Sequence, residues 1–168
     1  MKKIIINVSL IFIAFAVQNC VFPFIPFLSA SPNFMVILVF SFGFIYGSWE
    51  GMLYGVLAGI LMDLFYSGPF GFFTLIFMWI GFINGLLSRF FYEDYIVLPL
   101  AMCAVNEFAY NICLYVLRFL IRGKTDILFY TGAIIIPEII ITLIVTLFLY
   151  RFLLNYSKRI KEIDKKEV

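Results

Sequence analysis

Residues 43–59 read GFIYGSWEGMLYGVLAG, with a glycine at every fourth position from Gly43 to Gly59. Four residues are about one helical turn, so glycines at this spacing share a face wherever the segment is helical. In lipid, helices associate by close packing, and small residues four apart let two backbones approach. The stretch therefore predicts closely packed membrane helices. The expected packing positions are Gly43, Gly47, Gly51, Gly55 and Gly59, followed by Gly81 and Gly85 in the next apolar segment.

The polar triplet Ser48-Trp49-Glu50 interrupts this series of glycines. A single helix over residues 34–66 would be about 50 Å long, which is too long for a simple crossing. We therefore expect two short or tilted helices joined at the triplet, with a re-entrant pair as the alternative. If the chain turns there, the five glycines do not share one continuous face. Their close packing is expected within the chain, and docking of a partner's membrane helix is the alternative.

The composition of the whole chain indicates a membrane environment. Apolar residues make up 64% of the 168 positions, charged residues make up 13%, and the mean hydropathy is +1.08. A soluble domain usually has about 45–50% apolar and about 25% charged residues, so this chain lacks the polar surface to cover such a core in water. These values exclude a soluble enzyme, a secreted disulfide scaffold and a disordered tail. The net charge of +2 gives no indication of nucleic-acid binding.

Six apolar segments follow one another along the chain. A helix of roughly 20 apolar residues crosses a hydrocarbon core about 30 Å thick. We therefore expect an all-α polytopic membrane protein with about six transmembrane helices in residues 1–154, and a short charged cytoplasmic tail in residues 155–168. The segments are Ile4–Phe22, Phe34–Tyr46, Met52–Tyr66, Phe70–Phe91, Tyr95–Ile121 and Ile127–Leu154.

The distribution of Lys and Arg gives the predicted orientation. With six crossings and the N-terminus inside, nine basic residues lie on the inner side and three lie outside, in the loop around residues 118–126. Five crossings would place five inside and seven outside. The sequence therefore predicts that both ends are cytoplasmic. The charged tail is interpreted as part of this positive-inside pattern, with contact to anionic lipid or to a cytoplasmic protein as the alternative.

Two acidic residues fall near the middle of the last two predicted spans. Glu107 shares a helix face with Cys103 and Asn111, while Glu138 is followed on its face by Thr142 and Thr146. Because these spans are consecutive and antiparallel, we expect the two polar stripes to face each other. Ionisable groups at this depth are expensive, and no basic residue lies at comparable depth. At least one glutamate is therefore expected to be protonated, hydrogen-bonded to Asn106 or Asn111, or paired with a group outside the chain.

Other polar residues in the apolar segments have simpler interpretations. Asp63 is expected to accept hydrogen bonds from backbone N–H groups where the next helix begins near Pro69. Asn84 belongs to a small polar stripe that we interpret as a packing surface, and Pro137 is expected to kink the last span. The candidate intramembrane polar contacts are Asp63, Asn84, Asn106, Glu107, Asn111 and Glu138. They are interpreted as hydrogen-bonded contacts between helices, with a partner or ligand contact as the alternative.

The sequence predicts no catalytic, metal or cofactor site. The chain has no histidine, and a paired-carboxylate enzyme lacks a nucleophile or metal to support it. The cysteines, Cys20, Cys103 and Cys113, are odd in number and lack CxxC spacing, so we interpret them as small buried apolar residues. Cys20 follows Gln18-Asn19, which fits no signal-peptide cleavage site, so the first segment is expected to remain as an uncleaved helix.

Several short motifs resemble the bacterial rod shape-determining protein MreD family. Pro32-Asn33 precedes an apolar run, the Gly43/Gly47/Gly51 series follows, and residues 59–65 read GILMDLF. After a single tyrosine, Tyr66, the chain continues with Ser67-Gly68-Pro69-Phe70-Gly71. The length, the number of spans and the short charged tail agree with this family, so the resemblance covers essentially the whole chain.

The resemblance implies a non-enzymatic component of the cell-elongation machinery in the bacterial cytoplasmic (inner) membrane. Its partners would be membrane lipid, the single-span protein MreC, the actin-like protein MreB and the peptidoglycan polymerases. The implied fold is similar to the substrate-binding subunits of energy-coupling-factor vitamin transporters, which supplies the alternative function. A vitamin pocket would use Trp79, Asn84, Glu107, Asn111 and Glu138. Those subunits often carry a small-xxx-small motif in the first helix, whereas here Ala14 is followed by Gln18.

Overall fold

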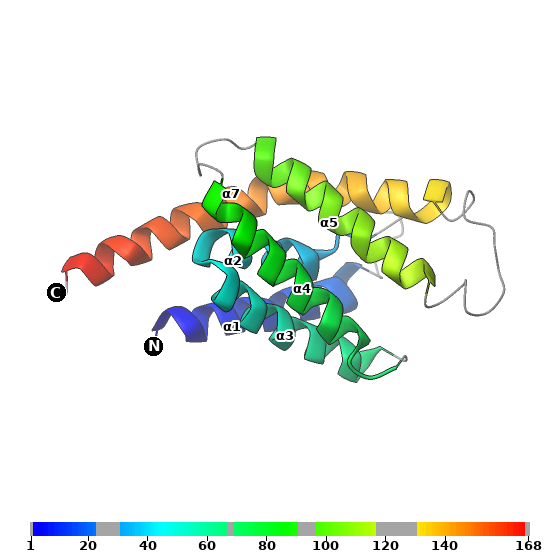
Figure 1. The fold of residues 1–168 in the computed structure, drawn as a ribbon, viewed down its shortest axis with the longest axis horizontal. Coiled ribbons are helices and arrows are strands. Elements are labelled where there is room, and N and C mark those ends of the chain that lie inside the picture. The colour runs from blue at the N-terminus through cyan, green and yellow to red at the C-terminus, as the bar shows by residue number, and fades with distance from the viewer. Residues whose placement is uncertain (1, 23–30, 67–68, 91–96, 117–130, 167–168) are drawn as a thin grey trace.

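The computed structural model describes residues 2–22, 31–66, 69–90, 97–116 and 131–166, and every regular element in these ranges is a helix (Figure 1). This confirms the expected all-helical class. Successive helices alternate in direction along the bundle (Figure 1). The helices are α1 (Lys2–Ala16) with a π-helical continuation (Val17–Val21), α2 (Phe34–Tyr46), α3 (Ser48–Phe65), α4 (Phe72–Leu87) with a 3-10 turn (Ser88–Phe90), α5 (Val97–Tyr115), and α7 (Ile136–Lys166), preceded by a π-helical turn (Thr131–Ile135).

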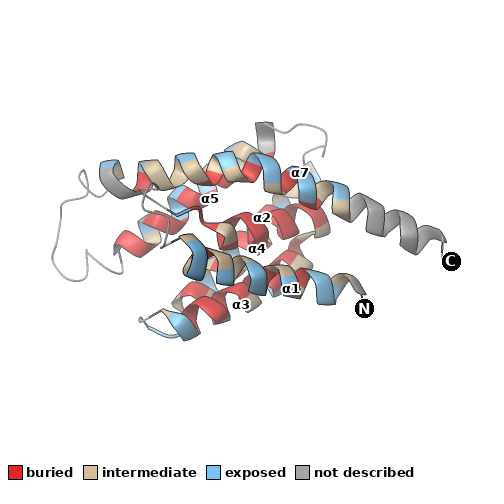
Figure 2. Ribbon diagram, turned by 180° about the vertical axis from the view of Figure 1, so that it is seen from behind, coloured by how far each residue is buried: buried red, intermediate tan, exposed pale blue. Residues whose placement is uncertain are grey.

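Helix α2 lies at the centre of the bundle and contacts α1, α3, α4, α5 and α7. All residues from Met35 to Ile45 are buried, and Figure 2 shows α2 as buried over almost its whole length. The sequence of α2 is apolar on every side, which is the pattern of a helix surrounded by others. Its 13 residues span about 20 Å, less than the hydrocarbon core of a bilayer. Helix α2 is therefore too short to cross a bilayer by itself, and other helices surround it.

Residues 34–66 form two helices, as the length argument predicted, but the link lies at a different residue. The chain turns at Gly47, with φ 97° and ψ 177°, a conformation that L-residues with a Cβ rarely adopt. The expected joint, Ser48-Trp49-Glu50, instead forms the first turn of α3. The polar triplet marks a helix start, and the glycine before it supplies the backbone freedom for the turn.

Glycines bring α2, α3 and α4 into backbone contact. A Cβ atom added to Gly51 would lie 2.6 Å from the carbonyl oxygen of Gly81, and one on Gly55 would collide with the carbonyl of Phe77. Gly59 faces the backbone of Thr74, Gly43 faces that of Gly81, and Gly85 faces that of Ser48. Gly47 differs from the other glycines of the series. A Cβ atom there would meet nothing within 4 Å, so its positive φ, and not close packing, requires glycine at this position.

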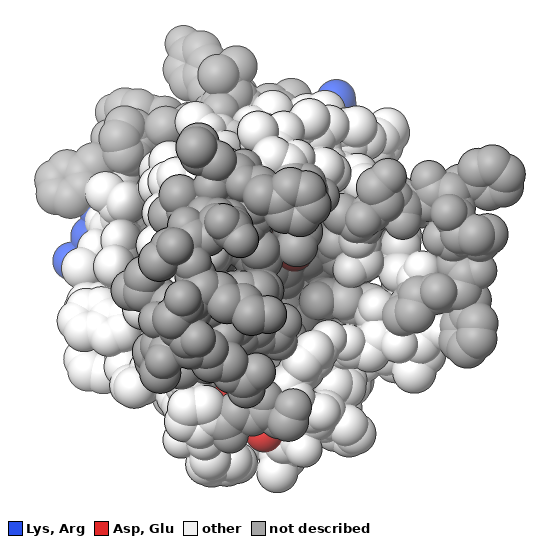
Figure 3. All heavy atoms as spheres, turned by 90° about the vertical axis from the view of Figure 1, so that its right-hand side faces the viewer, with Lys and Arg blue, Asp and Glu red and all other residues white. Residues whose placement is uncertain are grey.

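The outer helices expose apolar side chains. Two stretches, Lys3–Val21 and Ile136–Tyr156, are long and apolar enough to cross a membrane, and α2 and α4 are shorter apolar helices. In Figure 2 the outward sides of α1 and α7 are largely exposed, and the end-on view in Figure 3 shows that most described atoms belong to uncharged residues. The start of α1 and the end of α7 lie at the same end of the bundle (Figure 1).

Helix α7 differs from the predicted last span around Pro137 and at its C-terminal end, while the predicted start at Ile127 lies outside the described residues. Ahead of Pro137 the chain forms a π-helical turn (Thr131–Ile135). The distortion that we expected from this proline therefore takes the form of a change of helix type on its N-terminal side. At the other end α7 continues through the predicted tail to Lys166. The predicted loops containing Pro23 and Pro26, Gly68, and the basic residues 118–126 lie outside the described residues.

Candidate functional site

A buried polar cluster is centred on Asn33, the residue just before α2. The Asn33 side-chain oxygen accepts a hydrogen bond from the amide of Val36, the usual geometry of a helix N-cap. The backbone amide of Met35, also in the first turn of α2, donates to Oε1 of Gln18 at 3.2 Å. The first N–H groups of a helix have no partner within it, so a helix that starts in an apolar interior needs such acceptors. Gln18 and Asn33 supply them.

Glu107, in the middle of α5, lies against this helix start and is 0% exposed. Its Oε1 atom accepts hydrogen bonds from Nδ2 of Asn33 at 3.3 Å and from Nδ2 of Asn111 at 3.2 Å. Asn111 also donates to the backbone carbonyl of Glu107 at 3.1 Å. Both asparagines are almost fully buried. Glu107 therefore joins α5 to the N-terminus of α2 through a single carboxyl oxygen.

Helix α7 completes the cluster from the other side. The backbone N–H of Asn33 donates to Oγ1 of Thr142 at 3.1 Å, and Sγ of Cys103 lies 3.1 Å from Oγ1 of Thr146. Glu138, near the start of α7, is half-buried, and the Oε2 atom of Glu107 has no hydrogen-bond partner among the described residues. The polar stripes of α5 and α7 thus face each other, as their spacing predicted.

The electrostatic environment of Glu107 includes the N-terminus of α2. Aligned peptide dipoles give a helix start a partial positive charge of roughly half an elementary charge. No salt bridge within the described ranges involves Glu107, since the one found there joins Lys3 to Glu50. The helix start and the two asparagine amides therefore supply the positive potential around this carboxyl group.

A second buried contact joins α4 to α5. Nδ2 of Asn84 donates to Oδ1 of Asn106 at 2.9 Å, and Nδ2 of Asn106 donates back at 3.0 Å. Each side chain also donates to the carbonyl four residues earlier in its own helix. Of the two asparagines expected beside Glu107, Asn111 is its partner, whereas Asn106 pairs with Asn84. Asn84 thus makes a reciprocal interhelical pair, which its interpretation as a packing position did not include.

Asp63, near the end of α3, caps the start of α4. Its carboxylate accepts hydrogen bonds from the amides of Phe73 and Thr74, both at 3.0 Å, and from the Thr74 hydroxyl. Gly71, with φ 96°, brings the chain into α4 in a left-handed conformation. This confirms that Asp63 accepts hydrogen bonds where the next helix begins. Asp63 of the Asp-Leu-Phe motif and Gly71 therefore have a local structural role in the α3–α4 turn.

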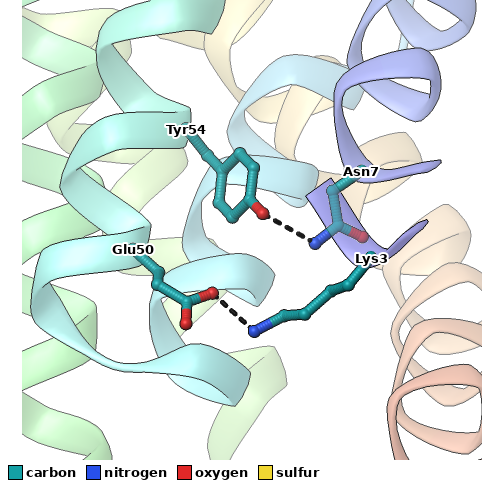
Figure 4. Close-up of polar contacts among 4 residues, drawn as sticks. All are labelled: Lys3, Asn7, Glu50 and Tyr54. Carbon is teal, nitrogen blue, oxygen red and sulfur yellow. Dashed lines mark hydrogen bonds and ion pairs between the residues drawn. The ribbon is translucent and has the colours of Figure 1, made fainter. Parts of the chain in front are cut away.

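Helix α1 is attached to α3 by polar side chains that the sequence analysis did not single out. Nζ of Lys3 lies 2.6 Å from Oε2 of Glu50, and Nδ2 of Asn7 donates to the Tyr54 hydroxyl at 3.1 Å (Figure 4). Lys3 also lies 3.9 Å from the centroid of the Tyr46 ring. The signal was present in the sequence, because Asn7 interrupts an apolar run and Glu50 is one of two acids between positions 4 and 88.

The residues considered for a vitamin pocket do not come together as one site. Trp79 is 54% exposed on the outer side of α4, where it lines a surface hollow of about 220 Å³ with Met52, Met78 and Phe82. Asn84 pairs with Asn106, while Glu107 and Asn111 are enclosed by α2 and α7. Within the described ranges, no group of three or more His, Cys, Asp or Glu side chains is arranged to hold a metal ion.

The chain matches one protein-family model, that of the rod shape-determining protein MreD, over residues 1–160. No curated protein and no solved structure matches it. Because the match covers nearly the whole length, the chain belongs to the MreD family, and the family resemblance is confirmed.

Proposed function

We propose that this member of the MreD family is a non-enzymatic scaffold of the bacterial cell-elongation (rod) complex. The family is defined by a role in rod shape determination, and the match over residues 1–160 is the observation that carries the proposal. As a scaffold, the protein would link the actin-like cytoskeleton inside the cell to peptidoglycan synthesis outside. Loss of the protein from a rod-shaped cell should therefore give rounded cells, and a plasmid copy should restore rods.

The scaffold is proposed to cross the cytoplasmic membrane several times, with both ends in the cytoplasm. The six α-helices of alternating direction within the described residues and two long apolar stretches support this arrangement, as does the nine-to-three distribution of basic residues. A Lys165→Cys variant in a cysteine-free background tests it. The thiol should react with an impermeant reagent only after the cells are opened. Labelling of intact cells from outside would refute the proposed topology.

The proposed partners are a single-span MreC-like protein, with MreB and the peptidoglycan polymerases as further members of the complex. The buried polar side chains described above bind one another, which leaves the apolar outer faces of the helices for contact with partners. Purification from mild detergent followed by mass spectrometry tests this. A co-purifying single-span protein supports the scaffold. A stoichiometric small molecule without such a protein would contradict it.

The proposal includes a fold related to the substrate-binding subunits of energy-coupling-factor transporters, which the all-helical arrangement of the described residues supports. It does not include vitamin transport, because Trp79 and Asn84 lie apart from the Glu107 cluster.

A further inference from the structure

We propose that the C-terminal part of α7, residues 157–166, docks onto a cytoplasmic protein that offers an apolar groove with acidic side chains along one edge. The proposal rests on the cytoplasmic C-terminus included in the proposed function, and it adds a docking face and a class of partner. The docking face consists of the positions Ile160 and Ile163, bordered on one side by Arg159 and Lys166.

Helix α7 is longer than a membrane crossing requires. It continues without interruption from Ile136 to Lys166, which is 31 residues or about 46 Å. The hydrocarbon core of a bilayer is about 30 Å thick, and the part of α7 up to Leu154 already covers about 28 Å. Figure 1 shows the C-terminal part of α7 extending past the start of α1 and beyond the other described helices. Helix α7 therefore projects from the bundle at the end where the N-terminus lies.

The apolar stripe of α7 continues into the projecting part. Leu153 is 2% exposed and belongs to the core of the bundle. Apolar residues follow at Tyr156, Ile160 and Ile163, a spacing that keeps all of them on one helix face. Counted from Tyr156 they are positions i, i+4 and i+7, the anchor spacing of helices that bind in apolar grooves. Every other position from 157 to 166 is polar or charged, so the projecting helix is amphipathic.

The two isoleucines lie at positions beyond the lipid. The headgroup region adds about 5–8 Å to each side of the hydrocarbon core. Along the helix axis, Ile160 lies about 9 Å and Ile163 about 13 Å beyond Leu154. A helix that binds the membrane surface lies in the plane of the interface, whereas this segment continues a helix that crosses the bundle lengthwise (Figure 1). A protein is therefore the partner that can cover both positions.

The charges beside the apolar face indicate the chemistry of that protein. Residues 157–166 include five basic and two acidic residues. Arg159 and Lys166 are seven residues apart and share one edge of the apolar face, whereas Asp164 lies at the other edge. Acidic side chains along the Arg159 and Lys166 edge of a groove would complement this arrangement. Such charges at the rim of an interface select the partner and fix its orientation.

Photo-crosslinking in living cells tests the docking face with the full-length chain. A photoreactive phenylalanine analogue replaces either Ile163, on the apolar face, or Lys165, on the opposite face. Irradiation should join position 163 to one cytoplasmic protein, with a much lower yield from position 165. Mass spectrometry of the crosslinked peptide should place the contact in an apolar surface of the partner that is flanked by Asp or Glu.

The sequence offers a matched pair of double variants for the charged edge. Arg159→Glu with Lys166→Glu reverses the edge, while Lys158→Glu with Lys165→Glu makes the same change in net charge on the opposite face. The edge variant should lower the yield of the adduct from position 163 roughly tenfold, and the other variant should leave it nearly unchanged. An equal loss in both variants would overturn the proposal, because net charge alone would then account for the binding.

The remaining outcomes of irradiation at position 163 also decide the proposal. An adduct with a second copy of the chain, an adduct with lipid alone, or no adduct would each overturn it. The labelling of Lys165→Cys locates the C-terminus independently of any partner. A cytoplasmic C-terminus without a protein adduct would therefore refute the docking helix and leave the proposed scaffold intact, whereas an external C-terminus would refute the proposed topology itself.

Discussion

Helix α3 contacts α4 through its backbone and contacts α1 through the ends of long side chains. At the α3–α4 contact, Gly51 and Gly55 lie directly against the carbonyls of Gly81 and Phe77. At the α1–α3 contact, the pairs are Lys3–Glu50, Asn7–Tyr54 and Asn19–Tyr66. In lipid there is no hydrophobic force between helices, so association depends on close packing or on hydrogen bonds. This bundle uses packing on one side of α3 and hydrogen bonds on the other.

The two contacts differ in what they specify. The partners in all three polar pairs between α1 and α3 are 47 residues apart, so these parallel helices have one register along their length. Glycine packing instead fixes the distance between α3 and α4, because any larger side chain would displace a backbone. We therefore expect substitutions in the glycine contact to cost more than removal of single polar pairs.

Gly55→Leu should have the largest effect. A branched side chain at this position would overlap the carbonyl of Phe77 and force α3 away from α4. Overpacking in a filled interior typically costs about 1–3 kcal/mol, and contact with backbone places this site at the upper end. The measurement is unfolding in detergent together with the yield of folded protein. Gly132→Leu is the control, since a Cβ there meets nothing within 4 Å. Equal stability of the two variants would show that the α3–α4 contact does not need glycine.

Asp63→Ala should be next, because the α3–α4 turn also depends on one polar side chain. The variant leaves the amides of Phe73 and Thr74 without their acceptor, and loss of a helix cap costs about 0.5–2 kcal/mol. Asp63→Asn retains one acceptor oxygen and should lose about half as much. If thermal unfolding ranks the asparagine variant below the alanine variant, capping is not the role of Asp63.

Tyr54→Phe should cost less, about 0.6 kcal/mol, the average for a single hydrogen bond between membrane helices. It removes the hydroxyl that accepts from Asn7 and leaves the ring in place. A double-mutant cycle with Asn7→Leu isolates the pair, because both single variants lose the same hydrogen bond. A coupling energy of zero would show that the Asn7–Tyr54 hydrogen bond does not stabilise the contact between α1 and α3.

Lys3→Met should have the smallest effect, at the low end of the roughly 0.2–1 kcal/mol range of exposed ion pairs, because the side chains of Lys3 and Glu50 are 28% and 43% exposed. The methionine keeps most of the apolar stem beside Tyr46 and removes the charge. The difference from the wild type should shrink further in high salt. A loss of stability as large as that of Gly55→Leu would mean that the Lys3–Glu50 pair stabilises the bundle as much as the α3–α4 glycine contact does.

The sequence predicted the helical class, the division of residues 34–66 into two helices and the role of Asp63, because each follows from local spacing and length. The sequence placed the turn at the polar triplet instead of at Gly47. A charged residue interrupts an apolar run in the same way whether it lies in a turn or in the first turn of the next helix. The continuation of α7 to Lys166 was missed for a related reason. Charge marks where a helix leaves an apolar environment and does not mark where the helix ends.

The candidate site was predicted in part. The facing stripes of α5 and α7 follow from helical periodicity, but the place where α2 starts against Glu107 depends on tertiary packing. Asn33 after Pro32 has the sequence signature of an N-cap. That signature indicates neither that the cap is buried nor that its side chain donates a hydrogen bond to Glu107. The register of α1 on α3 was likewise inaccessible, because single polar residues in apolar runs do not identify their partners.

If the buried polar cluster around Glu107 is an internal contact of a scaffold, a comparison of two Glu107 variants tests this most directly. Glu107→Gln keeps an oxygen for Asn33 and Asn111, whereas Glu107→Leu removes both side-chain hydrogen bonds at a cost of about 1 kcal/mol. Each is measured for thermal stability and for rescue of rod shape in a deletion strain. We expect the glutamine variant to be stable and to restore rods, and the leucine variant to be destabilised. A glutamine variant that is stable but restores no rods would contradict it, because the charge of Glu107 would then be needed by a partner.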